Sequence, residues 1–261
     1  MKDPIKMIVV DLDGTLLRDD KTISERTKSV LGRCKELDIK IVYATGRSGS
    51  FRDLQDLIDV DFLNSGIFDG RINMNGAIAR VGGEIVYSSL IPCQIARPLL
   101  MACDKRGLKI SSQIGSMHYT NFILEGLWSH LTNFEAVDFS KHDKDAEKIF
   151  SVLNSEEDRL FIEKHCPADC WLTVSRDGLA FVMHKDATKA RAVAHLANIW
   201  GIDGSEILAF GDDLNDADML SYVGVGVAMD NALDRVKNAA DFTCLSNEED
   251  GIAEWIMGNL L

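Results

Sequence analysis

Short apolar runs alternate with amphipathic segments along the first part of the chain. Residues 5–10 (Ile-Lys-Met-Ile-Val-Val) and 39–44 (Ile-Lys-Ile-Val-Tyr-Ala) are long enough for buried strands. Between them, apolar residues recur every three or four positions over 30–37, which is typical of a helix, and residues 22–25 (Thr-Ile-Ser-Glu) predict its start as a capping box. A second helix is expected over 51–58. This alternation with short connections predicts a parallel sheet with right-handed crossovers.

The regular alternation is interrupted in the middle of the chain and resumes late. The pair Asn75-Gly76 lies between two apolar segments and predicts a hairpin, which is foreign to a parallel alternation. Near the C-terminal end the pattern predicts a helix and three strands, over 188–200, 206–210, 223–229 and 240–244. We therefore predict an α/β fold with a Rossmann-like, parallel-sheet core formed by residues 1–83 and 184–261. Residues 84–183 are expected to form an inserted, smaller α+β domain.

Charge and composition indicate which kinds of binding partner are disfavoured. The chain has 28 Lys and Arg against 41 Asp and Glu, a net charge of −13, which disfavours binding to nucleic acid or to an anionic membrane surface. No run of about 18 apolar residues is present, and the first acidic residues come too early for a signal peptide. The six scattered cysteines are expected to be reduced thiols. A cytoplasmic protein is therefore expected, and whether it is a monomer or a small homo-oligomer is left open.

Two acidic clusters follow predicted strands that are about 200 residues apart. Asp11 and Asp13 flank Leu12 and are followed by Gly14, directly after the first strand. The second cluster is Gly211-Asp212-Asp213-Leu214-Asn215-Asp216, after the strand at 206–210. Either cluster alone would fit a solvated loop. Ligands bind at the carboxyl ends of parallel strands, however, and oxygen-rich clusters without cysteine suit hard cations such as Mg²⁺.

Two further segments could bind an anion. Thr45-Gly46-Arg47 ends the second strand, and a hydroxyl with exposed amide groups before a helix favours a negatively charged ligand. Lys189 stands in the first turn of its helix, where a cation opposes the helix dipole. Alone, the first segment would fit an ordinary strand-to-helix turn, and Lys189 would fit a surface lysine placed by chance.

Together, these four segments resemble the four-motif signature of the haloacid dehalogenase (HAD) superfamily. Their order and spacing are similar to those of its Cof-type phosphatases, in which a cap domain is inserted after the third core strand. The turn at Asn75-Gly76 matches the place where such proteins leave the core. One departure is Lys189-Ala190, where this subfamily often has Lys-Gly, and it leaves the lysine in place.

The resemblance implies a role for each motif residue. Asp11 is expected to attack phosphorus and become an aspartyl phosphate. Asp13 is expected to protonate the leaving oxygen and then deprotonate water, for which its neighbours must hold it protonated when it acts as the acid. Mg²⁺ is expected to bind the Asp11 side chain, the Asp13 carbonyl and Asp212, with Asp216 as a further or nearby ligand. The residues expected to hold the phosphoryl oxygens are Thr45, Gly46, Lys189 and Asn215. Asp213 and Arg47 are expected to support these residues without binding the phosphoryl group.

The resulting hypothesis is a Mg²⁺-dependent phosphatase of a small phosphorylated metabolite, such as a sugar phosphate or a phosphorylated cofactor. A phosphomutase shares the aspartyl phosphate and remains an alternative. A phospho-accepting signalling module also uses an acidic cluster, a Thr and a Lys at strand ends, but it needs no substrate cap. Candidate substrate contacts in the inserted domain are His118, Tyr119, Trp128, Arg176 and His184.

Overall fold

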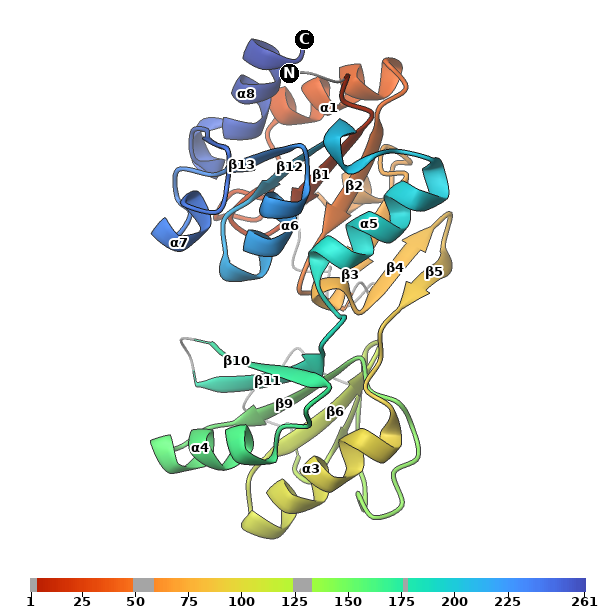
Figure 1. Cartoon of the computed structure of the whole chain (residues 1–261), viewed down its shortest axis with the longest axis vertical. Coiled ribbons are helices and arrows are strands. Elements are labelled where there is room, and N and C mark those ends of the chain that lie inside the picture. Colours follow the sequence, from red (N-terminus) through yellow and green to blue (C-terminus); the bar gives the residue numbers. More distant parts are fainter. Residues whose placement is uncertain (1–3, 49–58, 124–132, 176–177) are drawn as a thin grey trace. The chain divides into compact units, whose positions relative to one another are not determined.

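The computed structural model describes residues 4–48, 59–123, 133–175 and 178–261. The chain divides into two compact units, one formed by residues 1–88 and 188–261 and the other by residues 89–187 (Figure 1). The predicted helix at 51–58 lies outside the described residues.

The first unit is built on an eight-stranded sheet in the order β14-β13-β12-β1-β2-β3-β4-β5. Its strands are β1 (Met7–Asp11), β2 (Lys40–Ala44), β3 (Gly70–Asn73), β4 (Ile78–Val81), β5 (Glu84–Ser88), β12 (Ile207–Gly211), β13 (Val225–Ala228) and β14 (Phe242–Thr243). Neighbouring strands from β14 to β3 are parallel, and β4 and β5 are antiparallel additions. The α/β prediction with a parallel core is confirmed.

Helices cover both faces of this sheet because successive residues of a central strand point to opposite sides. Ile8 and Val10 of β1 pack with α1 (Glu25–Glu36) and α8 (Gly251–Asn259). Met7 and Val9 pack on the other side with α5 (Lys189–Trp200) and α6 (Ala217–Tyr222) (Figure 1). The remaining described helices of this unit are short, α2 (Val60–Leu63) and α7 (Asp234–Lys237).

The start of α1 differs from the prediction. Ser24, not Thr22, is the N-cap, and its hydroxyl accepts a hydrogen bond from the Thr27 amide. Thr22 instead donates its hydroxyl to the Asp20 carboxylate at 2.6 Å. The capping box at 22–25 is therefore wrong, because a local turn at Asp20 engages the threonine before the helix begins.

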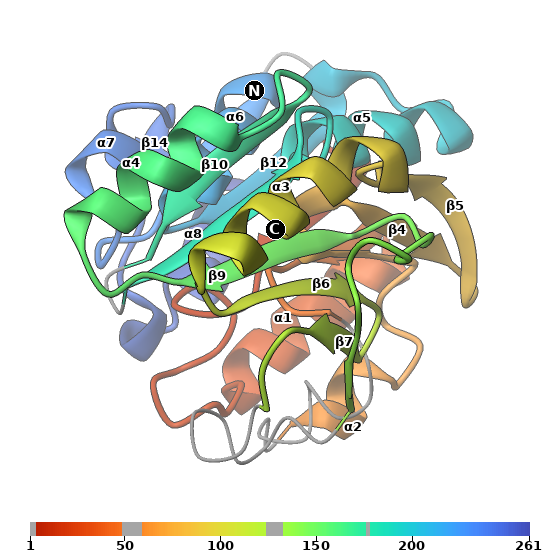
Figure 2. The same cartoon turned by 90° about the horizontal axis from the view of Figure 1, so that it is seen from below.

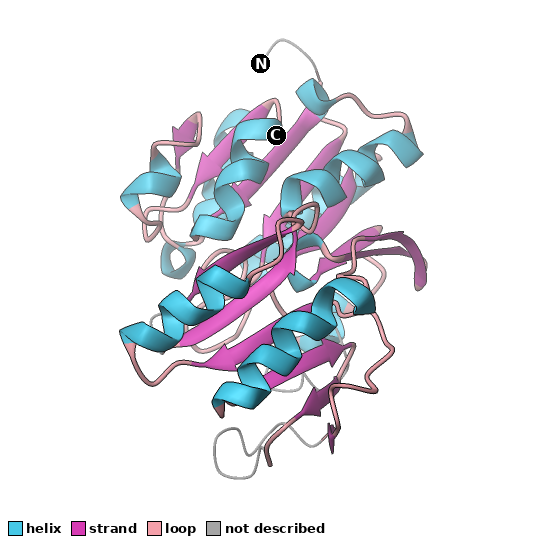
Figure 3. Ribbon diagram, turned by 60° about the horizontal axis from the view of Figure 1, so that its bottom comes forward, coloured by secondary structure: helices cyan, strands magenta, loops and turns pink. Residues whose placement is uncertain are grey.

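The second unit is a six-stranded sheet in the order β10-β11-β9-β6-β7-β8. The strands are β6 (Ile110–Ile114), β7 (Met117–Thr120), β8 (Phe134–Ala136), β9 (Lys148–Val152), β10 (Cys170–Val174) and β11 (Leu179–His184). Helices α3 (Cys93–Arg106) and α4 (Glu156–His165) lie on one face of this sheet and share an apolar core with it (Figures 2 and 3).

The boundaries between the two units lie four or five residues later in the chain than the predicted ones at 84 and 184. Strand β5 continues the hairpin from β4, so residues 84–88 belong to the first unit. Strand β11 pairs with β10 as far as His184, and residues 184–187 therefore stay with the second unit. The shift arises from backbone pairing at the ends of these strands. The amino-acid composition does not change there, so the sequence carries no sign of it.

Candidate active site

The carboxyl ends of three adjacent strands bring the motif residues to one edge of the core sheet. Strand β1 lies between β2 and β12 in parallel register. Asp11 is the last residue of β1, Thr45 follows β2, and Asp212 follows β12. Parallel strands end at the same edge, so residues that are 34 and 201 positions away from Asp11 in the sequence become its neighbours. We call these three residues, together with Lys189 and Asp216, which contact Asp11 and the Asp212 amide, the catalytic edge.

Lys189 joins two of the carboxylates of the catalytic edge. Its Nζ lies 2.5 Å from Asp11 Oδ1 and 2.5 Å from Asp216 Oδ1. All three side chains are buried. Burial acts to lower the pKa of Lys189, but Asp11 and Asp216 raise it above its usual value, so the lysine is charged. Burial, opposed by Lys189, raises the pKa of Asp11 well above its usual value.

Asp216 has both carboxylate oxygens engaged. Besides Lys189, it accepts hydrogen bonds from the amides of Asp212 at 3.0 Å and Asp213 at 3.1 Å. A side chain at Gly211 would approach Asp216 to 2.5 Å, so only glycine fits there. Asp213 turns to the backbone and accepts from the Leu214 amide at 2.8 Å. Asp216 therefore fixes the loop after β12 and orients Lys189.

Three carboxylates of the catalytic edge could hold a cation. One oxygen from each of Asp11, Asp212 and Asp216 lies within 4.8 Å of the others. The Thr15 hydroxyl donates to Asp212 Oδ1 at 2.7 Å, and a Cβ at Gly14 would come within 2.4 Å of Asp212 Oδ2. An all-oxygen donor set of this kind fits Mg²⁺. Burial, the largest cause, raises the pKa of Asp212 to about 7; the Asp216 charge adds to the rise, while the Thr15 hydroxyl and Lys189 act in the opposite direction.

Asp13 has a separate set of partners, and all of them are cations. Arg47 donates to both of its oxygens, each at 2.7 Å, and Lys21 Nζ lies 2.9 Å from Oδ1. Although burial acts in the opposite direction, these two cations lower the pKa of Asp13 to about 2. Asp13 is therefore ionised in this arrangement, and the expectation that its neighbours hold it protonated when it acts as the acid stays a prediction for the substrate complex. A bidentate guanidinium favours the carboxylate form.

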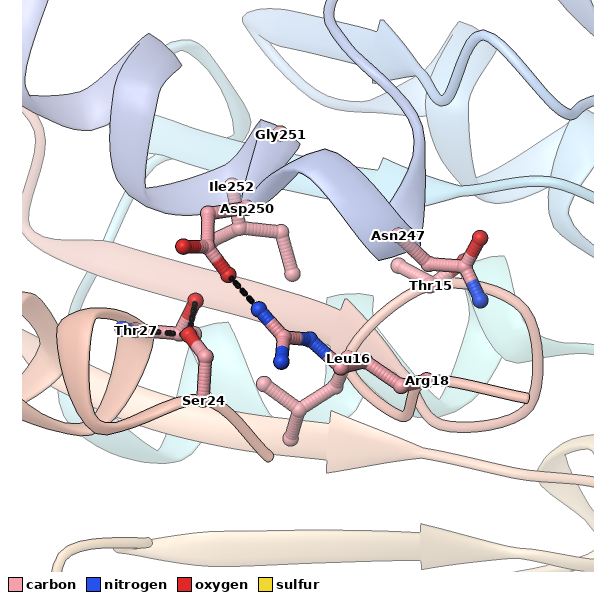
Figure 4. Close-up of a pocket in the computed structure, with 9 residues that line it drawn as sticks. All are labelled: Thr15, Leu16, Arg18, Ser24, Thr27, Asn247, Asp250, Gly251 and Ile252. Atoms are coloured by element: carbon pink, nitrogen blue, oxygen red, sulfur yellow. Dashed lines mark hydrogen bonds and ion pairs between the residues drawn. The ribbon is translucent and has the colours of Figure 1, made fainter. Parts of the chain in front are cut away.

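Three side chains attach the loop after Asp13 to the C-terminal part of the chain. Arg18 donates to the Asp250 carboxylate at 2.8 Å in a small pocket beside the start of α8 (Figure 4). Asn231 donates to the Gly14 carbonyl at 2.7 Å, and Asn247 to the Leu17 carbonyl at 3.0 Å. These contacts were not predicted, since no local pattern links positions more than 200 residues apart.

Three of the four residues expected to bind phosphate, Thr45, Gly46 and Asn215, line a cavity of about 220 Å³ together with Asp11 and Asp13. The fourth, Lys189, is buried behind Asp11 and does not line it. Thr45 is buried, and Gly46 follows it with no side chain. Asn215 donates its amide to Asn75 Oδ1 at 2.8 Å, and Asn215 Oδ1 has no partner among the described residues. A Cβ at Gly46 would lie 2.9 Å from Asn75 Oδ1. Asn75 therefore belongs to the site, although the sequence pattern indicated only a turn.

The hairpin turn supports the catalytic edge through Gly76. This residue has φ of +100°, and a Cβ there would lie 2.1 Å from the carbonyl oxygen of Thr188, the N-cap of α5. We expect Gly76→Ala to lower Tm by roughly 5–10 °C and to reduce turnover, because Lys189 must move with its helix. Gly83→Ala is the matched control, with φ of +92° and nothing within 4 Å. Equal Tm losses in both variants would show that backbone strain alone, not the close approach to Thr188, explains the effect.

The raised pKa of Asp212 predicts a pH-dependent stability in the absence of metal. Folding raises this pKa from an unfolded value near 4 to about 7, so Asp212 loses its proton less readily in the folded state than in the unfolded state. The folded state therefore becomes less stable as pH rises from about 4 to about 7. In chelator, Asp212→Asn should therefore raise Tm, by a few degrees more at pH 8 than at pH 5. Thermal unfolding at both pH values measures this difference. A gain that is the same at both pH values would contradict the electrostatic explanation.

In the second unit, the candidate contacts are largely internal. His118 and Tyr119 are buried within that unit, and His118 Nδ1 lies 3.4 Å from Ser111 Oγ. His184 is within hydrogen-bond distance of Ser89, at 2.9 Å. Trp128 and Arg176 lie outside the described residues.

Comparison with known proteins finds a family that matches nearly the whole chain. Residues 8–256 match the family of haloacid dehalogenase-like hydrolases. A putative phosphatase of Haemophilus influenzae is 30% identical, with 95% of both chains covered. The 5-amino-6-(5-phospho-D-ribitylamino)uracil phosphatase YitU of Bacillus subtilis is 26% identical, with 96% of both chains covered.

Solved structures give the same result for the fold. A sugar phosphatase of HAD subclass IIB has a TM-score of 0.80 and 26% identity to this chain, and 97% of this chain and 98% of that chain are covered. In the described parts of the present chain, no helix is both long and apolar enough to cross a membrane. From the match over residues 8–256 and these relatives, the chain belongs to the haloacid dehalogenase-like hydrolases, and within them to the Cof-type phosphatases that its four sequence motifs predicted.

Proposed function

We propose that this phosphatase hydrolyses the phosphomonoester of a small metabolite through a phosphorylated Asp11, with Mg²⁺ bound at the catalytic edge. One observation carries the proposal. The Asp11 carboxylate is buried at the edge of a cavity, and Lys189 fixes it beside Asp212 and Asp216. A carboxylate can approach a phosphate dianion only where cations offset the charge, and Lys189 supplies one of them.

In the first step, an oxygen of Asp11 attacks phosphorus. The bond from phosphorus to the ester oxygen breaks, and that oxygen takes a proton from Asp13 to leave as an alcohol. In the second step, Asp13 takes a proton from water, the water oxygen bonds to phosphorus, and the phosphorus–Asp11 bond breaks. Inorganic phosphate leaves, and both aspartates return to their starting forms. Thr45, the Gly46 amide, Lys189 and Asn215 hold the phosphoryl oxygens during both steps.

Asp13 must exchange its partners before it can act as an acid. Arg47 and Lys21 favour its ionised form in the present arrangement. A phosphoryl dianion in the adjoining cavity offers Arg47 another partner of the same geometry, since phosphate also binds guanidinium through two hydrogen bonds. Substrate binding would then raise the pKa of Asp13, which takes up one proton from solvent or from the phosphoryl group of the substrate and becomes a competent acid.

The acidic residues of the catalytic edge have different roles in binding Mg²⁺. Asp11 and Asp212 are proposed as direct ligands together with the Asp13 carbonyl. Asp216 has both oxygens in hydrogen bonds to Lys189 and to the two amides, which supports an orienting role. When bound, Mg²⁺ supplies positive charge against the phosphoryl oxygens. Arg47 and Asp213 both line the cavity. Arg47 is proposed to exchange Asp13 for the phosphoryl group, and Asp213 to hold the loop after β12 through the Leu214 amide.

A sugar phosphate or a phosphorylated cofactor is the proposed substrate class. The relatives described above include a phosphatase of a phosphoribitylamino-uracil and a sugar phosphatase. The cavity at the catalytic edge contains groups for the phosphoryl end only, so residues elsewhere must select the rest of the substrate.

A screen of about a hundred phosphorylated metabolites tests the proposal, with released phosphate as the readout. The expected result is steady release of inorganic phosphate, with kcat/KM highest for one chemical class. Conversion of a sugar phosphate into its isomer without phosphate release would indicate a phosphomutase. A phosphorylated protein that persists for many minutes without turnover would indicate a signalling module.

A further inference from the structure

A row of three polar side chains crosses the core sheet. In the strand register, Tyr43 of β2 lies opposite Arg71 of β3, and Arg71 lies opposite Arg80 of β4. Residues directly opposite on neighbouring strands have Cβ atoms about 5 Å apart, so the two guanidinium groups start from adjacent positions. We call these three residues the arginine row.

The two arginines of the row lack an acidic partner. No carboxylate of the described residues forms an ion pair with Arg71 or Arg80, and Arg71 instead interacts with the Tyr43 hydroxyl. Asp69 also lines the cavity described below, but Lys35 at 2.5 Å and Lys40 at 3.1 Å compensate its charge. Like charges that face each other across two strands are destabilising. In a chain with a net charge of −13, two adjacent arginines without a carboxylate therefore need another explanation.

A cavity lies against the row. It has a volume of about 170 Å³, and Tyr43, Arg71 and Arg80 all line it. The Phe68 ring forms part of an apolar wall of this cavity. It packs edge to face on the Tyr43 ring, with the two ring centroids 5.2 Å apart. At the β4–β5 turn, a Cβ added to either glycine of the pair 82–83 would meet no atom within 4 Å, so this side is open. The cavity has room for a small ion and donors to hold it.

The hydroxyl of Tyr43 adds a neutral donor to the two cations. The side chain is buried, and burial raises its pKa, although Arg71 and Arg80 act in the opposite direction. The phenol therefore keeps its proton at neutral pH. The two guanidinium groups offer forked, planar donors and the phenol adds a single O–H, a set that matches the oxygens of a tetrahedral dianion.

We propose that the arginine row is a second anion site, which binds inorganic phosphate or the phosphoryl group of a small phosphomonoester. It shares no lining residue with the cavity of the catalytic edge, which is lined by Asp11, Asp13 and the residues around them. Such a site would let the enzyme bind product or a phosphorylated effector without blocking the catalytic edge. The proposal does not depend on the mechanism at Asp11.

The test uses crystals of the full chain soaked in sodium tungstate, and calorimetric titration of the protein with inorganic phosphate. In the wild type, we expect anomalous peaks at the catalytic edge and between Arg71 and Arg80, with two classes of phosphate site. In Arg71→Gln/Arg80→Gln, the second peak and one class of site should disappear. Arg71→Lys keeps the positive charge but loses the paired N–H donors of the guanidinium group. It should weaken phosphate binding at the arginine row about tenfold.

Controls separate binding from general charge and from folding. Arg26→Gln/Arg235→Gln removes the same charge from exposed positions of the same unit and should keep both sites. In phosphate-free buffer, Arg71→Gln/Arg80→Gln should melt no lower than the wild type, because a repulsive pair is relieved. No peak at the row, or equal phosphate affinity in wild type and variant, would overturn the proposal. So would a loss of stability without phosphate, which would make the arginines structural. A missing peak at the catalytic edge would instead count against the proposed function.

Discussion

Asp11→Asn should lower kcat for every phosphomonoester by a factor of about 10³ or more. The amide cannot attack phosphorus, and Asp11 is the residue that ends β1 at the catalytic edge. The fold should survive, because the change is nearly isosteric and removes one of several negative charges that repel each other there. Hydrolysis of p-nitrophenyl phosphate, together with thermal unfolding, measures both effects.

Asp234→Asn is the matched control for this prediction. It makes the same chemical change at an exposed position of α7 in the same unit, and should leave kcat unchanged. Retention of a tenth of the wild-type activity by Asp11→Asn would remove Asp11 as the nucleophile. A collapse of Tm would leave kcat uninformative, and Asp11→Glu, which keeps the charge but displaces the oxygens, would then decide: it should also be inactive.

Removal of divalent metal should abolish turnover, and Mg²⁺ should restore it. Three carboxylates lie close to one another, two of them buried, and Lys189 supplies only one positive charge against them. Ca²⁺ should bind and yet support poor turnover, because it prefers more ligands at longer distances than Mg²⁺. The measurement is kcat after dialysis against chelator, followed by titration with each ion.

Two variants localise the metal within the catalytic edge. Asp212→Asn should raise the Mg²⁺ concentration needed for half-maximal activity by a factor of about ten or more, because a ligand loses its charge. Asp213→Asn should change it little, since that side chain caps the Leu214 turn. Full activity of the wild type in excess chelator would contradict the proposal of a metal at this site.

The architecture of the core could be predicted because the physics that sets it is local. Apolar runs of five or six residues became β1 and β2, and the three- to four-residue period became α1. The Asn75-Gly76 pair marked the β3–β4 hairpin, whose register pairs Asn73 with Ile78. The positions of Asp11 and Asp212 at one edge followed from strand ends alone.

The contacts that could not be predicted join distant residues. The bidentate pairing of Arg47 with Asp13 spans 34 positions, and the Arg18–Asp250 pair spans 232. Sequence spacing gives no information on which cation turns toward which carboxylate. The same reason explains the ionised state of Asp13, which depends on Arg47 and Lys21 rather than on its own motif. The pair 75–76 was recognised as a turn, but the hydrogen bond from Asn215 to Asn75 requires the folded sheet.

Phosphoryl transfer through Asp11 can be tested by chemical trapping of the phosphorylated enzyme. The enzyme with Mg²⁺ would be mixed with a substrate labelled in its phosphoryl group, quenched in acid within milliseconds and digested for mass spectrometry. We expect label on the peptide that contains Asp11, at a level that rises before free phosphate does, and no label in Asp11→Asn. Label on another residue, or release of phosphate with no labelled peptide at any time, would contradict a mechanism through Asp11.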